Sequence, residues 1–269
     1  LGDSLAIEIS PRFAFVATLA FGTPPQPLRC LLDTGSSETW VPSAGCAGCG
    51  ARGSFDESLS RTFSPLPAAN GSGGGPSKAR LVEVDYGTGH VAGRAAEDTV
   101  VFGAVRVSGA SFLVVDEALL PQHGAWDCIL GLGRSGPKGA RRPLHERLRE
   151  QQQRALFAIV PSGPSEASLV LGRVPSASVE PGSLVWVESR ALGRELEKFW
   201  TVPGSVAAGE HTWRADLVLD SGSNMVMMVP GASFARLLRA LLGPVHVETS
   251  CYANPAPGSD DVLCDCAVA

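Results

Sequence analysis

The chain has 269 residues, of which 44% are hydrophobic and 18% charged, and its formal net charge is −5. This composition is typical of a globular protein with one large or two ordinary domains, and it gives no reason to expect a nucleic-acid partner. No apolar run reaches the roughly 18 residues that a membrane span requires, and the first residues lack the pattern of a signal peptide. The abundant glycine and proline, 31 and 20 residues, favour a β-rich fold.

The first predicted elements are two strands joined by a turn, over residues 12–32. The turn is provided by "GTPPQP", which interrupts an otherwise apolar stretch. The second strand runs into "CLLDTGSSETWVP", residues 30–42, so that the carboxylate of Asp33 directly follows positions expected to be buried. A buried carboxylate is costly unless it is hydrogen-bonded or shares a proton, which makes Asp33 a candidate functional residue.

The predicted elements that follow are mostly strands. Residues 80–103 form two β-rich arms around the sequence Tyr86-Gly87-Thr88-Gly89, which predicts a hairpin. A charged helix with an apolar stripe is predicted within 141–160, because Leu144 and Leu148 are four residues apart. The remaining predictions are strands at 126–133, 167–174 and 183–189 and a helix at 231–243.

A second Asp motif repeats the first. Residues 217–230, "LVLDSGSNMVMMVP", have the same order of apolar run, Asp, hydroxyl residue, Gly, Ser, apolar run and Pro. An internal duplication explains this repeat, and it predicts that Asp33 and Asp220 meet. Two carboxylates about 3 Å apart cannot both ionise, so the pair shares one proton and supplies an acid and a base. Such a site needs neither a metal nor a covalent intermediate.

The seven cysteines divide into two groups by their surroundings. Cys30 and Cys128 lie in apolar runs and are expected to be buried free thiols, although neighbouring strands leave a bridge between them as the alternative. The others lie in loop-like sequences suited to disulfides in a secretory compartment: Cys46, Cys49, Cys251, Cys264 and Cys266. Asn70 begins an Asn-Gly-Ser sequon in a Gly-rich tract and is a glycosylation candidate, or a chance match.

Five motifs in order resemble those of the pepsin-like (A1) aspartic endopeptidases. They are "FGTPPQPLRCLLDTGSSETWVPS", "FDESLSRTF", "VDYGTG", "WDCILGLG" and "LVLDSGS", and the resemblance extends over nearly all of residues 10–266. A lone Asp-Thr-Gly would be a weak signal, whereas five motifs in the family's order are specific. The sequence departs from the family pattern in its short Cys46-to-Cys49 spacing, in Ser221 for the usual Thr, and in Cys128 for a small residue, usually Gly.

The resemblance implies an all-β, bilobal pepsin-like fold with β-barrel lobes, a few short helices and an incomplete C-terminal lobe. Residues 1–185 would form the N-terminal lobe with the first catalytic loop, the flap and the inter-lobe connection. Residues 186–269 would form part of the C-terminal lobe with the second catalytic loop. Asp33 and Asp220 would be the catalytic pair, supported in their loops by Thr34, Gly35, Ser36, Ser221, Gly222 and Ser223.

The same resemblance identifies a flap and a substrate pocket. Tyr86, Gly87 and Thr88 would form the mobile flap tip, and the indole N–H of Trp40 would donate to the Tyr86 phenol. For both aromatic residues, simple core packing is the alternative. Three further side chains would line an apolar pocket beside the pair and favour substrates with bulky apolar residues at the cut: Leu31, Phe112 and Ile129.

The resemblance also implies disulfides Cys46–Cys49 and Cys251–Cys266, with Cys264 as the other candidate partner of Cys251. It implies no cofactor and no metal. The expected partners are protein or peptide substrates of a monomeric enzyme with an acid pH optimum. The expected location is the secretory pathway, either extracellular or in an acidic vacuole or lysosome-like compartment.

Two other functions fit parts of the sequence. A catalytically inactive pepsin-like binding or inhibitor protein would keep the fold, but such members typically lose an Asp or the flap Tyr, and both are retained here. A four-thiolate zinc site would use Cys46, Cys49, Cys264 and Cys266, but these pairs fall in different predicted lobes.

The last expectation concerns the C-terminal end. Gly131, in the short apolar strand predicted to lie beside the first catalytic loop, follows Asp33 by 98 residues. An equal spacing after Asp220 would fall beyond residue 269, and no apolar-apolar-Gly segment follows Asp220 within the sequence. The sequence therefore predicts a fragment that lacks several strands and that, in isolation, is poorly soluble or inactive.

Overall fold

The computed structural model describes residues 4–10, 14–50, 53–67, 81–87, 89–120, 126–135, 142–152, 156–190, 197–208, 210–223, 232–253 and 262–264. The chain divides into two compact units. The first comprises Leu1–Thr201 with Val218–Asn224, and the second comprises Val202–Leu217 with Met225–Ala269. Both Asp-(Thr/Ser)-Gly-Ser motifs therefore belong to the first unit.

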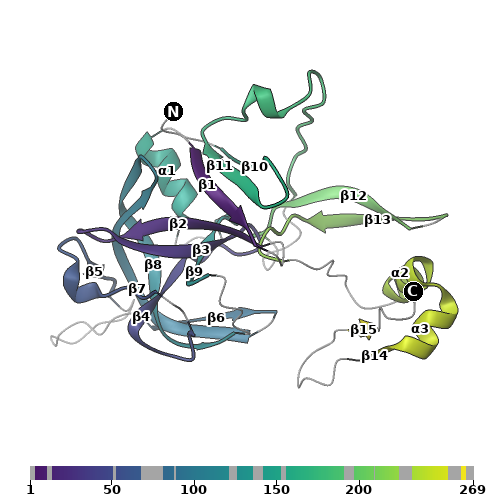
Figure 1. Ribbon diagram of the computed structural model, residues 1–269, viewed down its shortest axis with the longest axis horizontal. Coiled ribbons are helices and arrows are strands. Elements are labelled where there is room, and N and C mark those ends of the chain that lie inside the picture. Colours follow the sequence, from purple (N-terminus) through teal and green to yellow (C-terminus); the bar gives the residue numbers. More distant parts are fainter. Residues whose placement is uncertain are drawn as a thin grey trace. The chain divides into compact units, whose positions relative to one another are not determined.

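The first unit is built on an 11-stranded sheet with the strand order β10-β11-β1-β2-β3-β9-β4-β8-β7-β5, and β6 pairs with β7 beside this path (Figure 1). The strands are β1 (Ser4–Ile9), β2 (Phe15–Phe21), β3 (Gln26–Asp33), β4 (Trp40–Ala47), β5 (Ser64–Pro65), β6 (Leu81–Tyr86), β7 (Gly89–Phe102), β8 (Val105–Leu119), β9 (Cys128–Gly131), β10 (Phe157–Pro161) and β11 (Glu166–Leu171). The helical elements of this unit are short: 3-10 turns at Glu57–Leu59 and Ser176–Ser178 and helix α1 (Leu144–Gln152). The predicted all-β fold class is confirmed.

Two local predictions are confirmed by the strand pairing. β2 and β3 pair antiparallel across the predicted turn, with Phe21 opposite Gln26 at its edge. β6 and β7 form the predicted hairpin, in which Tyr86 stands opposite Gly89 at the tip. Both pairings join segments that are close in sequence, so the order of apolar runs and turn residues was sufficient to predict them.

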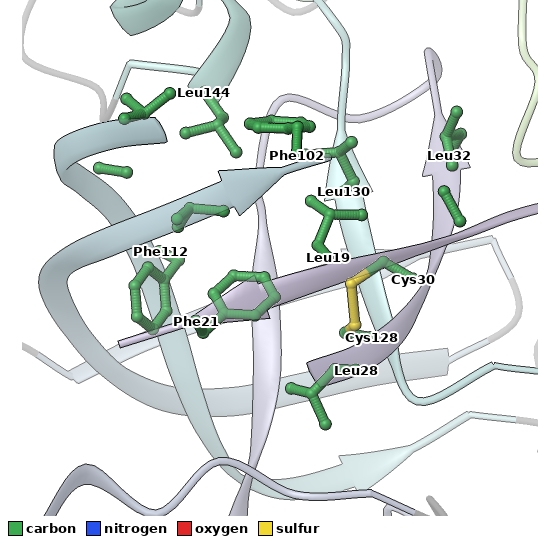
Figure 2. Packing of buried hydrophobic residues seen from close by; sticks show 14 of the residues in the cluster. Leu19, Phe21, Leu28, Cys30, Leu32, Phe102, Phe112, Cys128, Leu130 and Leu144 are labelled. Carbon is green, nitrogen blue, oxygen red and sulfur yellow. A yellow bond between two sulfur atoms is a disulfide. The ribbon is translucent and has the colours of Figure 1, made fainter. Parts of the chain in front are cut away.

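Side chains of β3 alternate between two buried clusters, because successive residues of a strand point to opposite faces. Cys30 and Leu32 belong to the larger cluster, which also contains Phe21 and Phe112 at a ring-centroid distance of 5.3 Å (Figure 2). Leu31 lies in the smaller cluster, which we call the Trp40 cluster: Leu31, Trp40, Cys49, Val91, Ala95, Leu113, Val115, Ala118 and Ile129. The two clusters cover opposite faces of the strand that carries Asp33.

Cys30 and Cys128 form a disulfide, which corrects the expectation of two free thiols. Their Cα atoms are 4.4 Å apart, and both side chains are fully buried among the aliphatic and aromatic groups of the larger cluster (Figure 2). The expectation rested on the apolar character of the two sequences, which correctly predicted burial. It failed because that character does not indicate the register that places Cys30 opposite Cys128.

β9 lies beside β3 in a parallel register that extends from the disulfide to the first catalytic loop. Cys30 is opposite Cys128, and Asp33 is opposite Gly131. Parallel neighbours must be joined by a crossover, and here the connection from β3 to β9 includes β4 through β8. The arrangement brings a strand from much later in the chain under the loop that begins at Asp33.

Helix α1 packs on the outside of the sheet through the predicted apolar stripe. Leu144 and Leu148 are each 1% exposed and join the larger cluster. Burying a leucine side chain contributes on the order of 2 kcal/mol, so this stripe anchors an otherwise charged helix. Two side chains add bonds to β8: Arg147 donates to the Gly109 carbonyl at 3.2 Å, and Gln151 donates to the Ser108 carbonyl at 2.7 Å.

Residues 183–189 are not a strand, which corrects the sequence prediction. Four consecutive apolar side chains in this segment are exposed by 48% to 74%: Leu184, Val185, Trp186 and Val187. A β-type residue pattern meets the local requirement for a strand, but a strand also needs a hydrogen-bonding neighbour. Among the described residues, no sheet includes this segment.

The second unit contains small separate elements. Strands β12 (Thr201–Ala208) and β13 (His211–Val218) form one two-stranded sheet, and β14 (Cys251–Ala253) and β15 (Val262–Cys264) form another. Helix α2 (Ala232–Leu242) confirms the predicted helix, whereas α3 (Pro244–Ser250) was not predicted. α3 begins with a proline. Proline is favourable in the first turn because a backbone N–H at that position makes no hydrogen bond within the helix, so its absence costs nothing.

Candidate active site

The first candidate catalytic residue, Asp33, lies at the end of β3 and is 6% exposed. Its Oδ1 accepts the Gly35 backbone N–H at 2.8 Å, and its Oδ2 accepts the Ser36 hydroxyl at 2.5 Å. Both oxygens are thus held by donors two and three residues further along the same loop. The Asp-Thr-Gly-Ser sequence therefore provides within four residues the hydrogen bonds that a buried carboxylate needs.

The second candidate, Asp220, is held in a corresponding way. Its Oδ1 accepts the Gly222 backbone N–H at 2.8 Å, which repeats the bond between Gly35 and Asp33. Asp220 and Ser223 are both half-buried. That Ser223 supports Asp220 as Ser36 supports Asp33 stays a prediction.

The two motifs are joined by four hydrogen bonds between residues far apart in sequence. The Thr34 N–H donates to Ser221 Oγ at 3.1 Å, and the Ser221 N–H donates to Thr34 Oγ1 at 2.8 Å. Each hydroxyl then donates to a carbonyl beside the other motif, Thr34 to Leu219 and Ser221 to Leu32, both at 2.7 Å. The hydroxyl residue of each motif is therefore what fastens the two loops together.

The glycines at the crossing allow the two carboxylates to approach. A Cβ atom added to Gly35 would overlap the Asp220 carboxylate, and one added to Gly222 would overlap the Asp33 carboxylate. Each carboxylate thus lies against the backbone of the opposite motif. Only glycine leaves the space that this arrangement requires.

The surroundings of Asp33 favour the protonated form of its carboxyl group. The pKa of Asp33 is raised from 3.8 to about 6, chiefly because burial disfavours the charged form. The Ser36 hydroxyl opposes this shift by stabilising the carboxylate, while the nearby negative charge of Asp220 raises the pKa further. Asp33 therefore tends to keep its proton at mildly acid pH.

Tyr86, at the tip of the β6–β7 hairpin, is linked to the first motif through Trp40. The indole Nε1–H of Trp40 donates to the Tyr86 hydroxyl at 3.0 Å, and Trp40 itself is 1% exposed. Burial raises the pKa of the Tyr86 phenol, and the neighbouring Asp33 carboxylate raises it further. Tyr86 therefore keeps its phenol proton, and it lies close enough to Asp33 for the carboxylate to disfavour loss of that proton. Gly87 forms the turn that follows Tyr86.

The three predicted pocket residues do not lie together. Leu31 and Ile129 are opposite each other in the β3–β9 pair and belong to the Trp40 cluster, against which Tyr86 packs. Phe112 points to the other face of β8 and packs edge-to-face against Phe21 in the larger cluster, where it is 1% exposed. The structure therefore leaves Leu31 and Ile129 near Tyr86 but does not bring Phe112 to them.

Two supporting residues were not found from the sequence. The Thr39 hydroxyl accepts the Gly131 N–H at 3.2 Å, and the Trp200 indole donates to the Leu132 carbonyl at 2.8 Å. Both residues hold the end of β9 against the first loop, where the Leu132 N–H also donates to the Asp33 carbonyl at 2.7 Å. Thr39 is a polar residue next to an apolar run, which could have indicated a supporting role. The sequence around Trp200 contains no pattern that indicates its contact with Leu132.

The remaining predicted sites are partly outside the described residues. Cys46 and Cys49 form the bridge that the resemblance implies. Cys251 is also disulfide-bonded, but the side chain of its partner is not among those described. Thr88, Asn70 and Cys266 lie outside the described residues.

The described residues contain no group of three or more His, Cys, Asp or Glu side chains placed to hold a metal ion. Within the same ranges, none of the helices is both long and apolar enough to cross a bilayer.

Comparison with known proteins identifies the family. The family model for eukaryotic aspartyl proteases matches residues 14–267. The chain is 34% identical to pepsin F of Oryctolagus cuniculus over 195 residues, covering 68% of this chain and 46% of that protein. It is 35% identical to pepsin A-5 of Mus musculus over 183 residues, covering 64% of this chain and 44% of that protein.

A longer match extends over most of the chain at lower identity. The chain is 26% identical to cathepsin E of Cavia porcellus over 249 residues, covering 87% of this chain and 59% of that protein. The chain thus spans about half the length of the curated relatives it matches. The family match covers both Asp motifs, the hairpin and the strand beside the first loop, and the chain belongs to the eukaryotic aspartyl protease family.

Proposed function

We propose that this protein is an aspartic endopeptidase that hydrolyses peptide bonds with a water molecule activated between Asp33 and Asp220. The observation that carries this proposal is the crossing of the two motifs, which brings one carboxylate against the backbone of the other loop. The family membership of the chain supports the same reaction class.

In the proposed reaction, the pair begins with one shared proton. The ionised carboxylate removes a proton from the water as the water oxygen attacks the peptide carbonyl carbon, and the protonated carboxyl donates to the carbonyl oxygen. The resulting tetrahedral diol collapses when the amide nitrogen gains a proton and the C–N bond breaks. The products are a carboxylic acid and an amine, and no covalent bond to the enzyme forms.

The raised pKa of Asp33 supports activity on the acid side of neutrality. Above about pH 6 the pair loses the proton that the carbonyl oxygen must receive, so the rate should fall. At strongly acid pH both carboxyls are protonated and no base remains. The expected dependence of kcat/KM on pH is bell-shaped, with its alkaline limb near the pKa of the pair.

Substrates are proposed to be proteins or peptides with apolar side chains at the cut. Support comes from Leu31 and Ile129, which belong to the cluster against which Tyr86 packs, and from the hairpin whose tip would close over a bound peptide. We further propose that Tyr86, Gly87 and Thr88 act as this lid, and that the enzyme works as a monomer.

The disulfides support a location in the secretory pathway, in an extracellular or an acidic vacuolar compartment. Cys30–Cys128 and Cys46–Cys49 are both closed in the first unit, and such bridges form and persist in oxidising compartments. Cathepsin E and "Vacuolar protease A" are among the proteins that the chain resembles.

The test is cleavage of an unfolded protein by the purified chain between pH 3 and pH 8, with and without a statine-type transition-state analogue. Asp33→Asn and Asp220→Asn are the matched variants, since the asparagine side chain has the size of aspartate but does not ionise. Cleavage that the analogue blocks and that both variants lose supports the proposal.

The opposing results are equally specific. Binding of peptides without turnover, unchanged in the two Asn variants, would favour an inactive pepsin-like binding protein. Wild-type rates in either Asn variant would exclude the shared-carboxylate mechanism.

A further inference from the structure

The Cys30–Cys128 disulfide lies at the start of the strand pair that supports the first catalytic loop. β3 and β9 run parallel, and the bridge joins them three residues before Asp33 on one strand and three residues before Gly131 on the other. At roughly 3.3 Å per residue, the bridge is about 10 Å from the residues at the end of the pair. It therefore fixes the register of the two strands close to the site.

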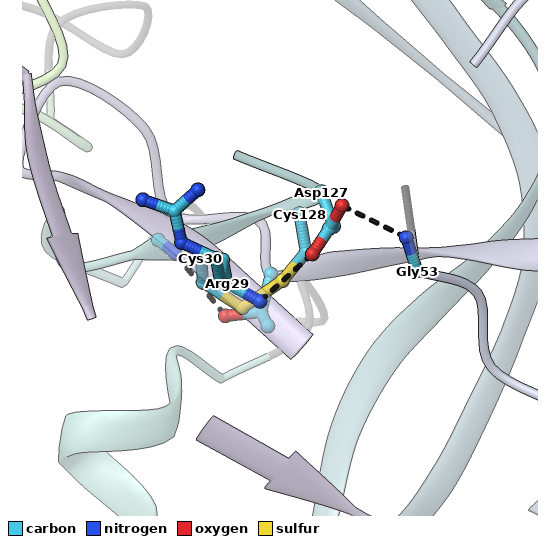
Figure 3. Close-up of a disulfide and its surroundings, with 7 residues drawn as sticks. Arg29, Cys30, Gly53, Asp127 and Cys128 are labelled. Carbon is cyan, nitrogen blue, oxygen red and sulfur yellow. Dashed lines mark hydrogen bonds between the residues drawn. A yellow bond between two sulfur atoms is a disulfide. The ribbon is translucent and has the colours of Figure 1, made fainter. Parts of the chain in front are cut away.

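Backbone and side-chain hydrogen bonds also join β3 to the start of β9 next to the disulfide, as Figure 3 shows. The Arg29 N–H donates to Asp127 Oδ2 at 3.0 Å, and the Asp127 N–H donates to the Arg29 carbonyl at 2.6 Å. Asp127 Oδ1 also accepts the Gly53 N–H at 3.0 Å, so the 7% exposed carboxylate joins a third segment to the pair. Arg29 and Asp127, the residues immediately before the two cysteines, are thus bonded to each other, and the disulfide joins the next residue of each strand.

The far end of β9 contacts the catalytic loop at several places. The Leu132 N–H donates to the Asp33 carbonyl at 2.7 Å, and the Gly133 N–H donates to the Ser36 carbonyl at 2.8 Å. A Cβ on Gly131 would lie 2.6 to 2.8 Å from the backbone of Ser37 and Glu38, so the loop rests directly on this glycine. Because packed backbones at such distances cannot move independently, a shift of β9 along β3 would displace the loop.

We infer that the Cys30–Cys128 disulfide is a positioning device for Asp33, which holds β9 in the register that keeps the first catalytic loop in its hydrogen-bonded form. This inference rests on the proposed function where catalysis is concerned, but the geometry of Asp33 can be measured without any activity. The two cysteines touch no reacting atom and act only through the β3–β9 pair.

The other described disulfide offers a matched control. Cys46–Cys49 is closed in the same unit, at the end of β4 and in the loop that follows it, and it does not join β3 to β9. Its removal costs the protein one bridge of the same chemistry and leaves the covalent link between β3 and β9 intact. Effects on Asp33 that depend on register should therefore differ between the two bridges.

The first experiment compares the full-length double variants Cys30→Val/Cys128→Ala and Cys46→Ala/Cys49→Ala with the wild type. The valine replaces part of the buried volume that the sulfur atoms occupied and limits the cavity. The readouts are the pKa of the Asp33 carboxyl by ¹³C NMR and the hydrogen exchange of the amides of Leu132 and Gly133.

In the Cys30/Cys128 variant we expect the pKa of Asp33 to change by about one unit, because burial of the carboxyl and its Ser36 and Gly35 hydrogen bonds all depend on the loop. Exchange of the Leu132 and Gly133 amides should accelerate at least tenfold, since their acceptors lie on the displaced loop. The Cys46/Cys49 variant should keep the wild-type pKa and the wild-type exchange at these amides. Unchanged values in both variants would overturn the inference.

A second measurement applies if the Cys30/Cys128 variant does not fold. Cys46 is partly exposed, whereas Cys30 and Cys128 are fully buried, so a phosphine reductant should open Cys46–Cys49 first. Exchange at Leu132 and Gly133 is then followed in the wild type while mass spectrometry counts which bridges are open. Acceleration only in the species with Cys30–Cys128 open supports the inference, and acceleration that begins with Cys46–Cys49, or none, contradicts it.

Kinetics separate this inference from the proposed function. If the wild type cleaves peptides, the Cys30/Cys128 variant should lose about ten- to a hundredfold in kcat with little change in KM, as expected for a misplaced catalytic group. If no form cleaves but the pKa and exchange effects are present, positioning holds and the proposed function fails. If the wild type cleaves and the variant matches it in kcat, pKa and exchange, the function stands and positioning is wrong.

Discussion

Thr34 and Ser221 hydrogen-bond each other in both directions, although 187 residues separate them along the chain. The backbone N–H of each residue donates to the hydroxyl oxygen of the other, at 3.1 and 2.8 Å. Each hydroxyl donates in turn to a carbonyl, of Leu219 and of Leu32 respectively. The geometry of either Asp loop therefore depends on the other.

Replacing Ser221 tests this dependence. Ser221→Ala removes the acceptor of the Thr34 N–H and a donor to the Leu32 carbonyl, which should lower the free energy of unfolding by about 1–3 kcal/mol. Ser221→Thr keeps the hydroxyl and should restore most of that stability. Urea denaturation of the three proteins measures the effect, and equal stability of the Ala and wild-type proteins would contradict it.

Adding a single methyl group at the crossing should disrupt the carboxylate pair. Gly222→Ala places a Cβ against the Asp33 carboxylate and should abolish peptide hydrolysis and any binding of a statine-type analogue. Gly163→Ala is the matched control, because nothing lies within 4 Å of a Cβ at that glycine. Isothermal titration with the analogue checks both variants, and retained binding by Gly222→Ala would show that the loops can separate without loss of the site.

Short-range patterns predicted the parts of the fold that local sequence determines. The Asp33 and Asp220 loops, the hairpin at Tyr86 and helix α2 each depend on residues within about a dozen positions, and each was found. The loops were recognisable because a polar Asp-(Thr/Ser)-Gly-Ser is costly at the end of an apolar run unless it has a role.

Long-range relationships were not predictable in the same way. The resemblance placed the strand at 126–133 beside the first catalytic loop, but the bridge also depends on the register that puts Cys30 opposite Cys128, which no local pattern encodes. Residues 183–189 have the composition of a strand, but whether a strand forms depends on a partner. The contact of Trp200 with the Leu132 carbonyl likewise follows from packing, since nothing near either residue marks it.

The link between Trp40 and Tyr86 should affect catalysis more than stability. Trp40→Phe removes the N–H that donates to the Tyr86 hydroxyl at 3.0 Å but keeps most of the buried ring. The loss of one such bond should lower the free energy of unfolding by about 1 kcal/mol. Because the hairpin tip would close over a bound peptide, kcat/KM should fall more steeply, by at least tenfold.

Tyr86→Phe and the double variant complete a mutant cycle with Trp40→Phe. A coupling energy near that of the hydrogen bond is expected between the two positions, because each single change removes the same bond. Tyr86→Ala should lower kcat/KM far more than stability. Comparable losses in both would indicate that Tyr86 is mainly a core aromatic residue.

The raised pKa of Asp33 predicts how stability depends on pH. Between pH 4 and pH 6 the folded state holds on Asp33 a proton that the unfolded chain has released, so the contribution of Asp33 to the free energy of unfolding falls as pH rises through this window. A shift from 3.8 to about 6 corresponds to about 3 kcal/mol. The contribution is fully present below pH 4 and lost above pH 6.

Asp33→Asn should remove this dependence, since its side chain does not titrate. The comparison is the difference in the free energy of unfolding between pH 4 and pH 7, by urea denaturation of the wild type and the variant. If both proteins show the same difference, the pKa of Asp33 is not raised in the folded state.

His145 should have the opposite effect on the same pH range. Its ring packs against Phe157 and Trp200, with centroid distances of 5.5 and 6.3 Å, and burial lowers its pKa from 6.5 to about 4. Glu146 raises this pKa and Arg149 lowers it, but burial is the larger effect. Between pH 4 and pH 6.5 the unfolded chain binds the extra proton, so stability is full above pH 6.5 and falls as pH decreases to about 4.

The contribution of His145 is about 3 kcal/mol, similar in size and opposite in sign to that of Asp33. The contributions of Asp33 and His145 should largely cancel in the wild type, so together they should change its free energy of unfolding little between pH 4 and pH 7. His145→Gln removes one of them and leaves Asp33 to act alone, so this variant should become more stable relative to the wild type as pH falls from 7 to 4. Urea denaturation at both pH values measures that difference. A His145→Gln profile parallel to the wild type would mean that the folded protein tolerates a protonated ring beside Phe157 and Trp200.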